Sequence, residues 1–288
     1  SSRMDPAGQS PFADAVRGAI RRRECLGLAV VPAVLIGVFL SPEPVRRSLT
    51  FAYADPSVAT AVTAHFVHFS LEHLLANLLG YVVLAGLGYV LAGLGGCRRL
   101  FGVAAATYLL AFPPVLSALN LAVPRRAVGF GFSGINMAFA GLLPVLLAVY
   151  AGRHLDSRIR PRHAPTLFFA ALTLVALSLP HSPVTAGLAA AAALGTAGYV
   201  GAAVSALRTG DRPGDGPSGA RSGWLDVFVV GVAATLGFAV AGFPAAPVRG
   251  GAVVNLYVHL LGFCLAFIVP YVGVELGAFD VGARRPDP

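Results

Sequence analysis

Lysine is absent from this chain of 288 residues, and charged side chains of every kind make up only 12% of it. Soluble globular domains carry about a quarter charged residues. The hydrophobic residues, at 56%, stand in long blocks without charge, and such blocks are stable in lipid but not in water. The shortage of charge therefore excludes an ordinary soluble domain and predicts an integral membrane protein.

Cysteine is rare as well, and its three positions are scattered without a CxxC pair: Cys25, Cys97 and Cys264. We interpret them as small apolar packing residues and not as disulfides or metal ligands. The histidines do not form an HExxH pattern, and no carboxylate inside a predicted membrane span would complete a metal site with the four candidates, His65, His68, His73 and His259. We therefore expect no metal and no cofactor.

Carboxylates are missing from the middle of every apolar block, since Glu72, Asp226 and Glu275 lie at block ends. Proton- and ion-coupled transporters usually place carboxylates near the bilayer midplane. Their absence argues against a small-molecule transporter, which stays open only as a third hypothesis.

The formal net charge of +8 would suit nucleic-acid binding. However, all 21 basic residues are arginines in short clusters between the apolar blocks, and no nucleic-acid-binding motif accompanies them. We interpret them as topology anchors at the cytoplasmic membrane surface. The lipid bilayer, and not nucleic acid, is therefore the partner that we expect for this charge.

Eight apolar segments are predicted to cross the membrane, so the expected fold class is all-α, a polytopic membrane helical bundle. A span needs roughly 20 residues at about 1.5 Å per residue, so the first and fifth segments are short, and six or seven spans are the alternative counts. The segments cover residues 25–40, 74–94, 100–123, 133–150, 165–179, 184–207, 224–243 and 253–274. They lie in a membrane domain over 25–276, flanked by a cytoplasmic segment over 1–24 and a cytoplasmic tail over 277–288.

The arginines predict the orientation, because positive charge concentrates on the cytoplasmic side of a membrane. We expect a multi-pass protein of the cell membrane with a cytoplasmic N-terminus, since this orientation places sixteen arginines inside and five outside. The inner set is Arg3, Arg17, Arg21, Arg22, Arg23, Arg98, Arg99, Arg153, Arg158, Arg160, Arg162, Arg208, Arg212, Arg221, Arg284 and Arg285, and the outer set is Arg46, Arg47, Arg125, Arg126 and Arg249. Residues 210–223 have the composition of a cytoplasmic linker, and the partly apolar outer loop, 41–64, is expected to lie in the membrane interface.

Polar residues that a membrane penalises gather at the start of three segments. Segments two, four and eight are even-numbered, so all three run inward from the outside and their first turns lie at one depth. His259 is six residues past Val253, about 9 Å along its helix. We therefore expect one polar layer just below the outer surface, formed by His65, His68, His73, Asn77, Ser133, Asn136, Asn255 and His259.

Ser133 stands in the stretch Gly-Phe-Gly-Phe-Ser-Gly that ends at Gly134. A nucleophilic serine needs an exposed hydroxyl and free backbone N–H groups nearby, and a glycine-rich turn that enters a helix offers both. His259 could then act as general base and afterwards as general acid. Alone, the Gly-x-Ser-Gly pattern is more typical of helix packing, which small residues mediate in membranes.

His73 and Asn77 are four residues apart, so they share one helix face. Both can donate hydrogen bonds to an oxyanion, or they can join neighbouring helices without a catalytic role. We interpret His68 as a structural residue that bonds to the loop backbone.

Three motifs together resemble the rhomboid family of intramembrane serine proteases. The stretch 68–78 resembles the family's signature on the second helix, in which His73 is followed four residues later by Asn77. The stretch Gly131 to Gly134 resembles the family's Gly-x-Ser-Gly nucleophile motif, and 259–262 resembles its final His-x-x-Gly. The motifs occur in the family's order, and with the helices that bear them they cover roughly half of the chain.

The resemblance implies a rhomboid-like core and a serine endopeptidase with a Ser133–His259 dyad, no acidic third member and single-span membrane proteins as substrates. It further implies that Asn77, His73 and the Ser133 backbone N–H form the oxyanion site. Helix-destabilising residues near the outer end of a substrate would favour cleavage, because a helical carbonyl is tied in an i to i−4 hydrogen bond. The motif residues expected to support this site are Gly131, Gly134, Gly262 and His68.

The chain departs from the family pattern in four ways. Rhomboid cores commonly have six helices with one between the serine and histidine helices, whereas three are predicted here, and two inserted helices preserve the parity. Met137 stands where many members carry a tyrosine packed on the histidine, Ala266 replaces a common glycine, and the first outer loop lacks a Trp-Arg pair because Trp224 is the only tryptophan. A catalytically inactive rhomboid-like protein that binds membrane clients is therefore the second hypothesis, although the intact Ser133 and His259 argue against it.

Overall fold

The computed structural model describes residues 11–123, 126–209, 222–245, 248–249, 252–279 and 281. The helices in this part are α1 (Pro11–Ala19), α2 (Arg22–Leu40), α3 (Glu43–Ser48), α4 (Val58–Thr63), α5 (Leu71–Gly95), α6 (Arg98–Leu110), α7 (Phe112–Asn120), α8 (Ser133–His154), α9 (Ala164–Ser178), α10 (Pro183–Thr209), α11 (Ser222–Ala241) and α12 (Leu256–Glu275), with the short 3-10 helices η1 (Ala64–Phe66) and η2 (Pro161–His163). Strand β1 (Phe51–Ala52) pairs with β2 (Val128–Gly129), and β3 (Val248–Arg249) pairs with β4 (Ala252–Val253).

Six of the described helices are long and apolar enough to cross a membrane: α2, α5, α8, α10, α11 and α12. They correspond to six of the eight predicted segments and make the protein an all-α, polytopic helical bundle. The predicted third segment is broken into α6 and α7, which are bent by 50° and count as a seventh span only if the pair crosses as one. The predicted fifth segment is α9, whose 15 residues fall short of the roughly 20 that a span needs. The structure thus supports six or seven spans, and the count of eight is not confirmed.

Two prolines explain the bend between α6 and α7. Pro113 and Pro114 stand in the first turn of α7, directly after the helix that ends at Leu110. Proline has no N–H group for the helical ladder, and its ring clashes with the carbonyl of the residue four positions earlier, here Leu109 and Leu110. An apolar segment of sufficient length therefore forms two shorter helices instead of one straight span.

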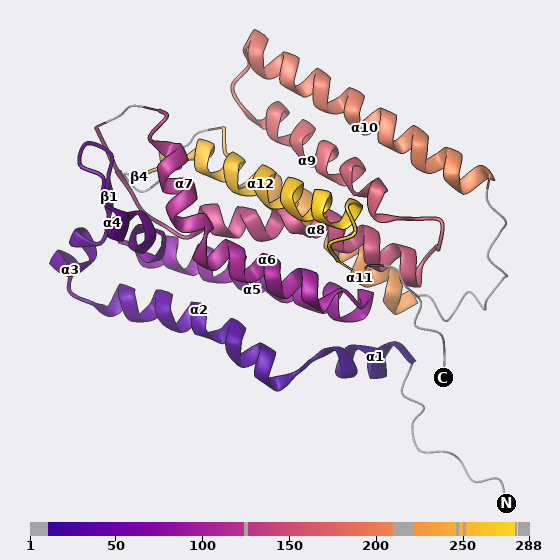
Figure 1. Cartoon of the computed structure of the whole chain (residues 1–288). Coiled ribbons are helices and arrows are strands. Elements are labelled where there is room, and N and C mark those ends of the chain that lie inside the picture. The colour runs from indigo at the N-terminus through magenta and orange to yellow at the C-terminus, as the bar shows by residue number, and fades with distance from the viewer. Residues whose placement is uncertain are drawn as a thin grey trace, which may run out of the picture.

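Helices α5, α8 and α12 all begin at one end of the bundle, which we call the serine end because α8 starts there with Ser133 (Figure 1). Helix α2 ends at the same place, and the chain continues there through α3, β1 and α4 before it enters α5. The first turns of α5, α8 and α12 are therefore neighbours, although long stretches of sequence separate them.

Helix α8 is the centre of the bundle. Its residues 134–151 are buried without exception, and α5, α9, α11 and α12 pack around it. By contrast, α2 and α10 leave large apolar side chains exposed, among them Val30, Leu40, Leu188 and Leu194. Such a surface is stable against lipid tails, which are as apolar as leucine.

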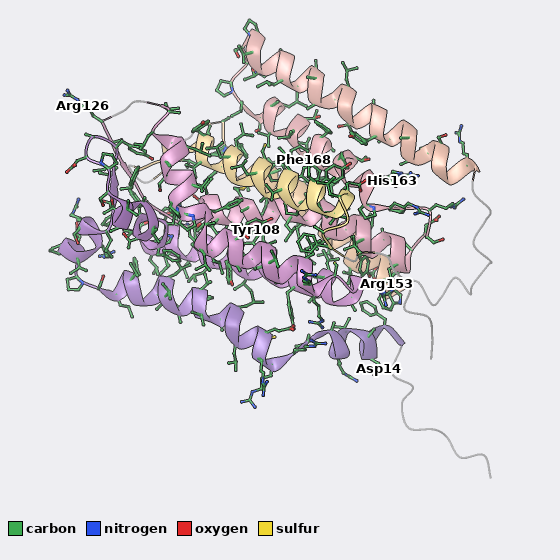
Figure 2. All side chains as sticks on the ribbon, in the orientation of Figure 1. Asp14, Tyr108, Arg126, Arg153, His163 and Phe168 are labelled. Carbon is green, nitrogen blue, oxygen red and sulfur yellow. The ribbon has the colours of Figure 1, made fainter. Side chains whose placement is uncertain are left out.

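Aromatic side chains fix α12 between α6 and α9. The Tyr108 hydroxyl donates a hydrogen bond to the Ala266 carbonyl at 2.8 Å, and Phe168 stacks on Phe267 with ring centroids 3.9 Å apart. Figure 2 labels Tyr108 and Phe168 within the crowded interior of the bundle. Helix α12, which carries His259, is thus held on two sides.

Glycines allow α8 and α12 to touch backbone to backbone. A β-carbon at Gly262 would overlap the carbonyl oxygen of Gly134, and a β-carbon at Gly141 would overlap that of Phe263. Ala266 is fully buried on the same face of α12. Small residues let membrane helices approach closely, and this approach determines how far His259 lies from Ser133.

The predicted outer loop, 41–64, folds over the serine end. Phe51 pairs with Gly129 in the small sheet of β1 and β2, and its side chain is buried. Two residues past β2, the Gly131 N–H donates a hydrogen bond to the Ala64 carbonyl at 3.0 Å. The loop therefore holds the segment that leads into Ser133.

Several sequence-based predictions lie outside the described residues. They concern positions 1–10 of the N-terminal segment, 210–221 of the linker, 280 and 282–288 of the tail, and the arginines Arg3, Arg125, Arg212, Arg221, Arg284 and Arg285. Of the described arginines, Arg98 follows the far end of α5 and Arg153 lies in the last turn of α8, both away from the serine end. Arg46 and Arg47, in α3, lie at the serine end.

The glycine contact predicts a sharp difference between two Gly→Ala substitutions. Gly262→Ala should destabilise the protein by about 1–3 kcal/mol, because the new methyl group meets the Gly134 backbone and forces α8 and α12 apart. Gly86→Ala in α5 is the matched control, since a β-carbon there would have nothing within 4 Å. Unfolding in detergent micelles measures both, and equal stability of the two variants would contradict the packing described.

Candidate functional site

A serine and a histidine from two different helices form a hydrogen bond at the serine end. The Nε2 atom of His259, in the first turn of α12, lies 2.7 Å from the Oγ atom of Ser133, the first residue of α8. The His259 side chain is buried, at 5% exposure. The two residues that the sequence analysis paired across 126 positions are therefore direct neighbours.

A glycine in an unusual conformation precedes the serine. Gly131 has a backbone φ of 107°, which residues other than glycine rarely adopt. A β-carbon there would also lie 2.8 Å from Cε1 of the His73 ring. Both facts explain why glycine is required at this position, and they place the His73 imidazole against the turn that carries Ser133.

Ser133 lies at the start of α8, where the backbone N–H groups have no partner within the helix. The first hydrogen bonds of the helix come from the N–H groups of Ile135 and Asn136, both to the Phe132 carbonyl. The N–H groups of Ser133 and Gly134 precede these bonds, as the first donors of any helix do. They are close to the serine hydroxyl and available to a negatively charged oxygen.

The second ring nitrogen of His259 determines which tautomer the residue adopts. Its Nδ1 atom lies 2.6 Å from the carbonyl oxygen of Gly242, in the turn after α11. A carbonyl oxygen can only accept, so Nδ1 carries the proton and Nε2 is left to accept one from the Ser133 hydroxyl. His259 is therefore in the state that a general base requires.

Gly242 is the residue at this site that the sequence analysis missed. It acts through its backbone, and no side-chain pattern reports a backbone carbonyl. Met137, the departure noted above, packs on this turn: a β-carbon at Gly242 would lie 2.7 Å from the Met137 sulfur. The ring beside His259 is that of Phe243, edge-on at 6.0 Å between centroids.

Asn77 takes part in a closed hydrogen-bond network. Its Nδ2 atom donates to the His73 carbonyl at 3.0 Å and to Nε2 of His68 at 3.1 Å. Its Oδ1 atom accepts from Nδ2 of Asn136 at 3.1 Å, and the Asn77 carbonyl accepts from the same atom at 2.9 Å. Because an amide nitrogen carries two hydrogens, both donors of the Asn77 side chain are occupied in this arrangement.

His73, the other predicted oxyanion donor, is placed differently. Its ring lies between Phe130 and His68, at 5.9 and 4.8 Å between centroids, and faces Gly131. The His73 ring is thus more available to a ligand than the Asn77 amide, whose two donors are occupied.

His68 is part of the scaffold under this network. Its side chain is completely buried, and Arg46 from α3 donates a hydrogen bond to its carbonyl at 2.8 Å. Burial, together with the neighbouring His73, lowers the pKa of His68 to about 3. The ring is therefore neutral and can accept from Asn77, in agreement with a structural role. Arg46, which had been interpreted only as a topology anchor, is the loop residue that fixes this segment.

A second Ser–His pair lies at the same end of the bundle. Nε2 of His65 is 3.1 Å from Oγ of Ser117, and that hydroxyl donates to the Ala61 carbonyl at 2.8 Å. The Ala61 carbonyl competes with the histidine for the serine proton, and the pair joins α4 and η1 to α7. Two similar side-chain pairs thus differ in chemistry because of one backbone acceptor.

The site offers an oriented hydroxyl, an imidazole in the base tautomer and backbone donors beside them. Among the described residues, no group of three or more His, Cys, Asp or Glu side chains could hold a metal ion. Comparison of the chain with protein-family models, with curated proteins and with solved structures gives no match.

His65 predicts a pH-dependent opening of the loop over the serine end. Burial lowers the pKa of His65 from 6.5 to about 4, so the unfolded loop binds a proton more readily than the folded one. His65 therefore contributes its full share to the stability of the folded loop above pH 6.5, and this contribution declines as the pH falls toward 4. Hydrogen exchange of residues 58–68, corrected for its intrinsic rate, should accelerate between pH 7 and 4.5. His65→Gln should reduce this acceleration, and an unchanged pH response in that variant would contradict the assignment.

Proposed function

We propose that this chain is a serine endopeptidase of the rhomboid type, which cleaves single-span membrane proteins inside the bilayer. One observation carries the proposal: Oγ of Ser133 lies 2.7 Å from Nε2 of His259, whose other nitrogen is bound to the Gly242 carbonyl. This is the relation between a nucleophile, its base and a group that orients the base. The long apolar helices around the pair supply the membrane setting.

The proposed reaction begins with attack on the scissile carbonyl carbon. Nε2 of His259 takes the proton from Ser133 as Oγ forms its bond to that carbon, and the carbonyl oxygen becomes an oxyanion. The intermediate then expels the substrate nitrogen, which receives the same proton from His259. The product of this half is an acyl ester on Ser133 and a free amine on the released fragment.

Water completes the cycle. His259 removes a proton from a water molecule, the hydroxide attacks the ester, and Oγ of Ser133 leaves and regains the proton. The second fragment then carries a new carboxylate. Each half uses the same two side chains, and no cofactor enters the balance.

Oxyanion stabilisation is proposed to come first from the backbone. The N–H groups of Ser133 and Gly134 stand at the start of α8, where the helix dipole also favours negative charge. The His73 ring is placed beside the same turn. The Asn77 amide can contribute only if it releases one of its two present acceptors, His68 or the His73 carbonyl.

The membrane topology belongs to the same proposal. In this topology the protein lies in the cell membrane with its N-terminus in the cytoplasm. The serine end then faces the outside of the cell. The arginine distribution supports this orientation, since Arg98 and Arg153 lie at the opposite end. Substrates would then be cut near the outer ends of their transmembrane helices, where a locally unwound backbone exposes a carbonyl.

A second candidate function is the binding of membrane clients without cleavage. The observation that favours it is the occupied amide of Asn77, because this side chain can join the backbone donors at an oxyanion only after it releases one of its present acceptors. The two candidates differ in one property, the reactivity of Ser133.

Reaction with a fluorophosphonate probe tests the protease directly. Purified protein should take up the probe at Ser133, because His259 activates that hydroxyl, and should cleave a single-span reporter in liposomes. Ser133→Ala should abolish both activities.

Ser117→Ala is the matched control for this experiment. It removes the serine of the second Ser–His pair, whose proton is directed to Ala61, and should leave labelling and cleavage unchanged. Labelling that is absent in the wild type, or that persists in Ser133→Ala, would exclude the protease and favour the client-binding protein.

Asn77→Ala tests the oxyanion contribution. We expect kcat to fall by about ten- to a thousandfold with KM unchanged, the effect of removing a donor that acts only in the transition state. Asn120→Ala removes another buried amide at the serine end and controls for stability. Unchanged kcat in Asn77→Ala would assign this residue to the scaffold with His68.

A further inference from the structure

The turn after α11 presents two successive carbonyl groups to two different helices. The Gly242 carbonyl accepts from Nδ1 of His259 in α12 at 2.6 Å. The next carbonyl, that of Phe243, lies 3.0 Å from Oγ of Ser178, the last residue of α9. The group that orients His259 is therefore one peptide unit away from a contact with α9.

The Ser178 hydroxyl has a local acceptor as well. Its Oγ lies 2.8 Å from the Val175 carbonyl, three residues earlier in α9, so one hydrogen is shared between Val175 and Phe243. A serine at a helix end often bonds to its own helix, and that bond alone would have no consequence for the site. Thr173 shows this simple case, because its hydroxyl donates only to the Phe169 carbonyl of the same helix. The bond to Phe243 is what distinguishes Ser178.

The opposite side of the turn is closed by packing. A β-carbon at Gly242 would lie 2.7 Å from the Met137 sulfur and 3.1 Å from the Phe238 carbonyl. The Phe243 side chain is 2% exposed and stands edge-on to the His259 ring. The turn thus rests against α8 on one side and is held by α9 on the other.

We propose that Ser178 is a positioning residue for the dyad: by holding the Phe243 carbonyl, it keeps the Gly242 carbonyl on Nδ1 of His259. In the other tautomer, Nδ1 would direct a lone pair at the carbonyl oxygen, and Nε2–H would face the Ser133 hydroxyl. A turn that is free to move would allow both tautomers, whereas a fixed turn allows one. The catalytic consequence rests on the proposed protease function, but the tautomer itself does not.

This assignment gives α9 a role in the chemistry of the site. The helix is too short to count among the spans, yet it packs on α8 and α11 and ends at the turn that orients the base. The Gly242 carbonyl, held in place by the Ser178 hydroxyl, has the position relative to His259 that a carboxylate has relative to the histidine of a catalytic triad.

Nitrogen-15 NMR of histidine-labelled protein measures the tautomer without any need for activity. In the wild type, His259 should show one protonated nitrogen, Nδ1, and one unprotonated nitrogen, Nε2. In Ser178→Ala the two signals should move toward each other, as a mixture of tautomers requires. Ser178→Thr keeps the hydroxyl and should restore the wild-type spectrum, and Thr173→Ala, which removes only a local bond in α9, should leave it unchanged.

Kinetics on the same four proteins measures the consequence. We expect kcat of Ser178→Ala to fall by about tenfold, a fraction of the roughly 10²–10⁴-fold that a general base supplies, with KM unchanged. The midpoint of thermal unfolding should be similar for Ser178→Ala and Thr173→Ala, since each loses one helix-end or helix-internal hydroxyl.

Gly242→Ala provides a second test in case Ser178→Ala does not fold. The added methyl group meets the Met137 sulfur and displaces the carbonyl, so it should produce the same mixture of tautomers, whereas Gly237→Ala, with nothing within 4 Å, should not. A single Nδ1–H tautomer in both Ser178→Ala and Gly242→Ala would overturn the inference. If the wild type shows that tautomer but never reacts with a fluorophosphonate, the protease proposal fails and the positioning role of Ser178 stands.

Discussion

The close approach of α8 and α12 is the constraint on which the rest of the site depends. Two backbones touch at Gly134 and Gly262, and this contact brings the first turns of both helices within reach of one hydrogen bond. Without it, the imidazole of His259 would lie too far from Ser133 to accept its proton. The aromatic contacts of Tyr108 and Phe168 hold α12 from the other sides, so the distance is maintained by packing on several faces. Chemistry at this site is therefore a property of helix packing.

Around this contact, hydrogen bonds join the buried polar side chains of the serine end, although four of their atoms, Arg46 Nε, His65 Nδ1, His68 Nδ1 and Asn136 Oδ1, have no partner among the described residues. A buried polar group without a hydrogen bond is costly in a membrane protein, where water cannot replace the partner. The chain meets this cost with a network from the Arg46 side chain through His68 and Asn77 to Asn136, and with the carbonyl of Gly242 for His259. The same network that stabilises the serine end occupies the Asn77 amide, which links the stability of the scaffold to the completeness of the proposed oxyanion site.

Hydroxyl side chains of the same chemical type form different hydrogen bonds in this structure because their surroundings differ. Ser133 and Ser117 each lie beside a histidine, but at Ser117 the Ala61 carbonyl competes with the ring for the proton. Ser178 and Thr173 are both hydroxyl residues of α9, but only Ser178 reaches another helix. In each case one backbone carbonyl makes the difference, and backbone carbonyls leave no trace in a sequence pattern.

Sequence alone determined the membrane class, most of the helical segments and the residues that meet at the serine end. Long apolar blocks can be recognised locally, and the direction of each span follows from its place in the order of spans. Ser133, His73 and His259 could therefore be placed in one layer before any contact was known. The tertiary structure decided what depends on distance and direction: the break at Pro113, the shortness of α9, the occupied amide of Asn77 and the role of Gly242. Periodicity and composition report where a residue prefers to be, whereas hydrogen bonds form between atoms whose separation only the packed bundle sets.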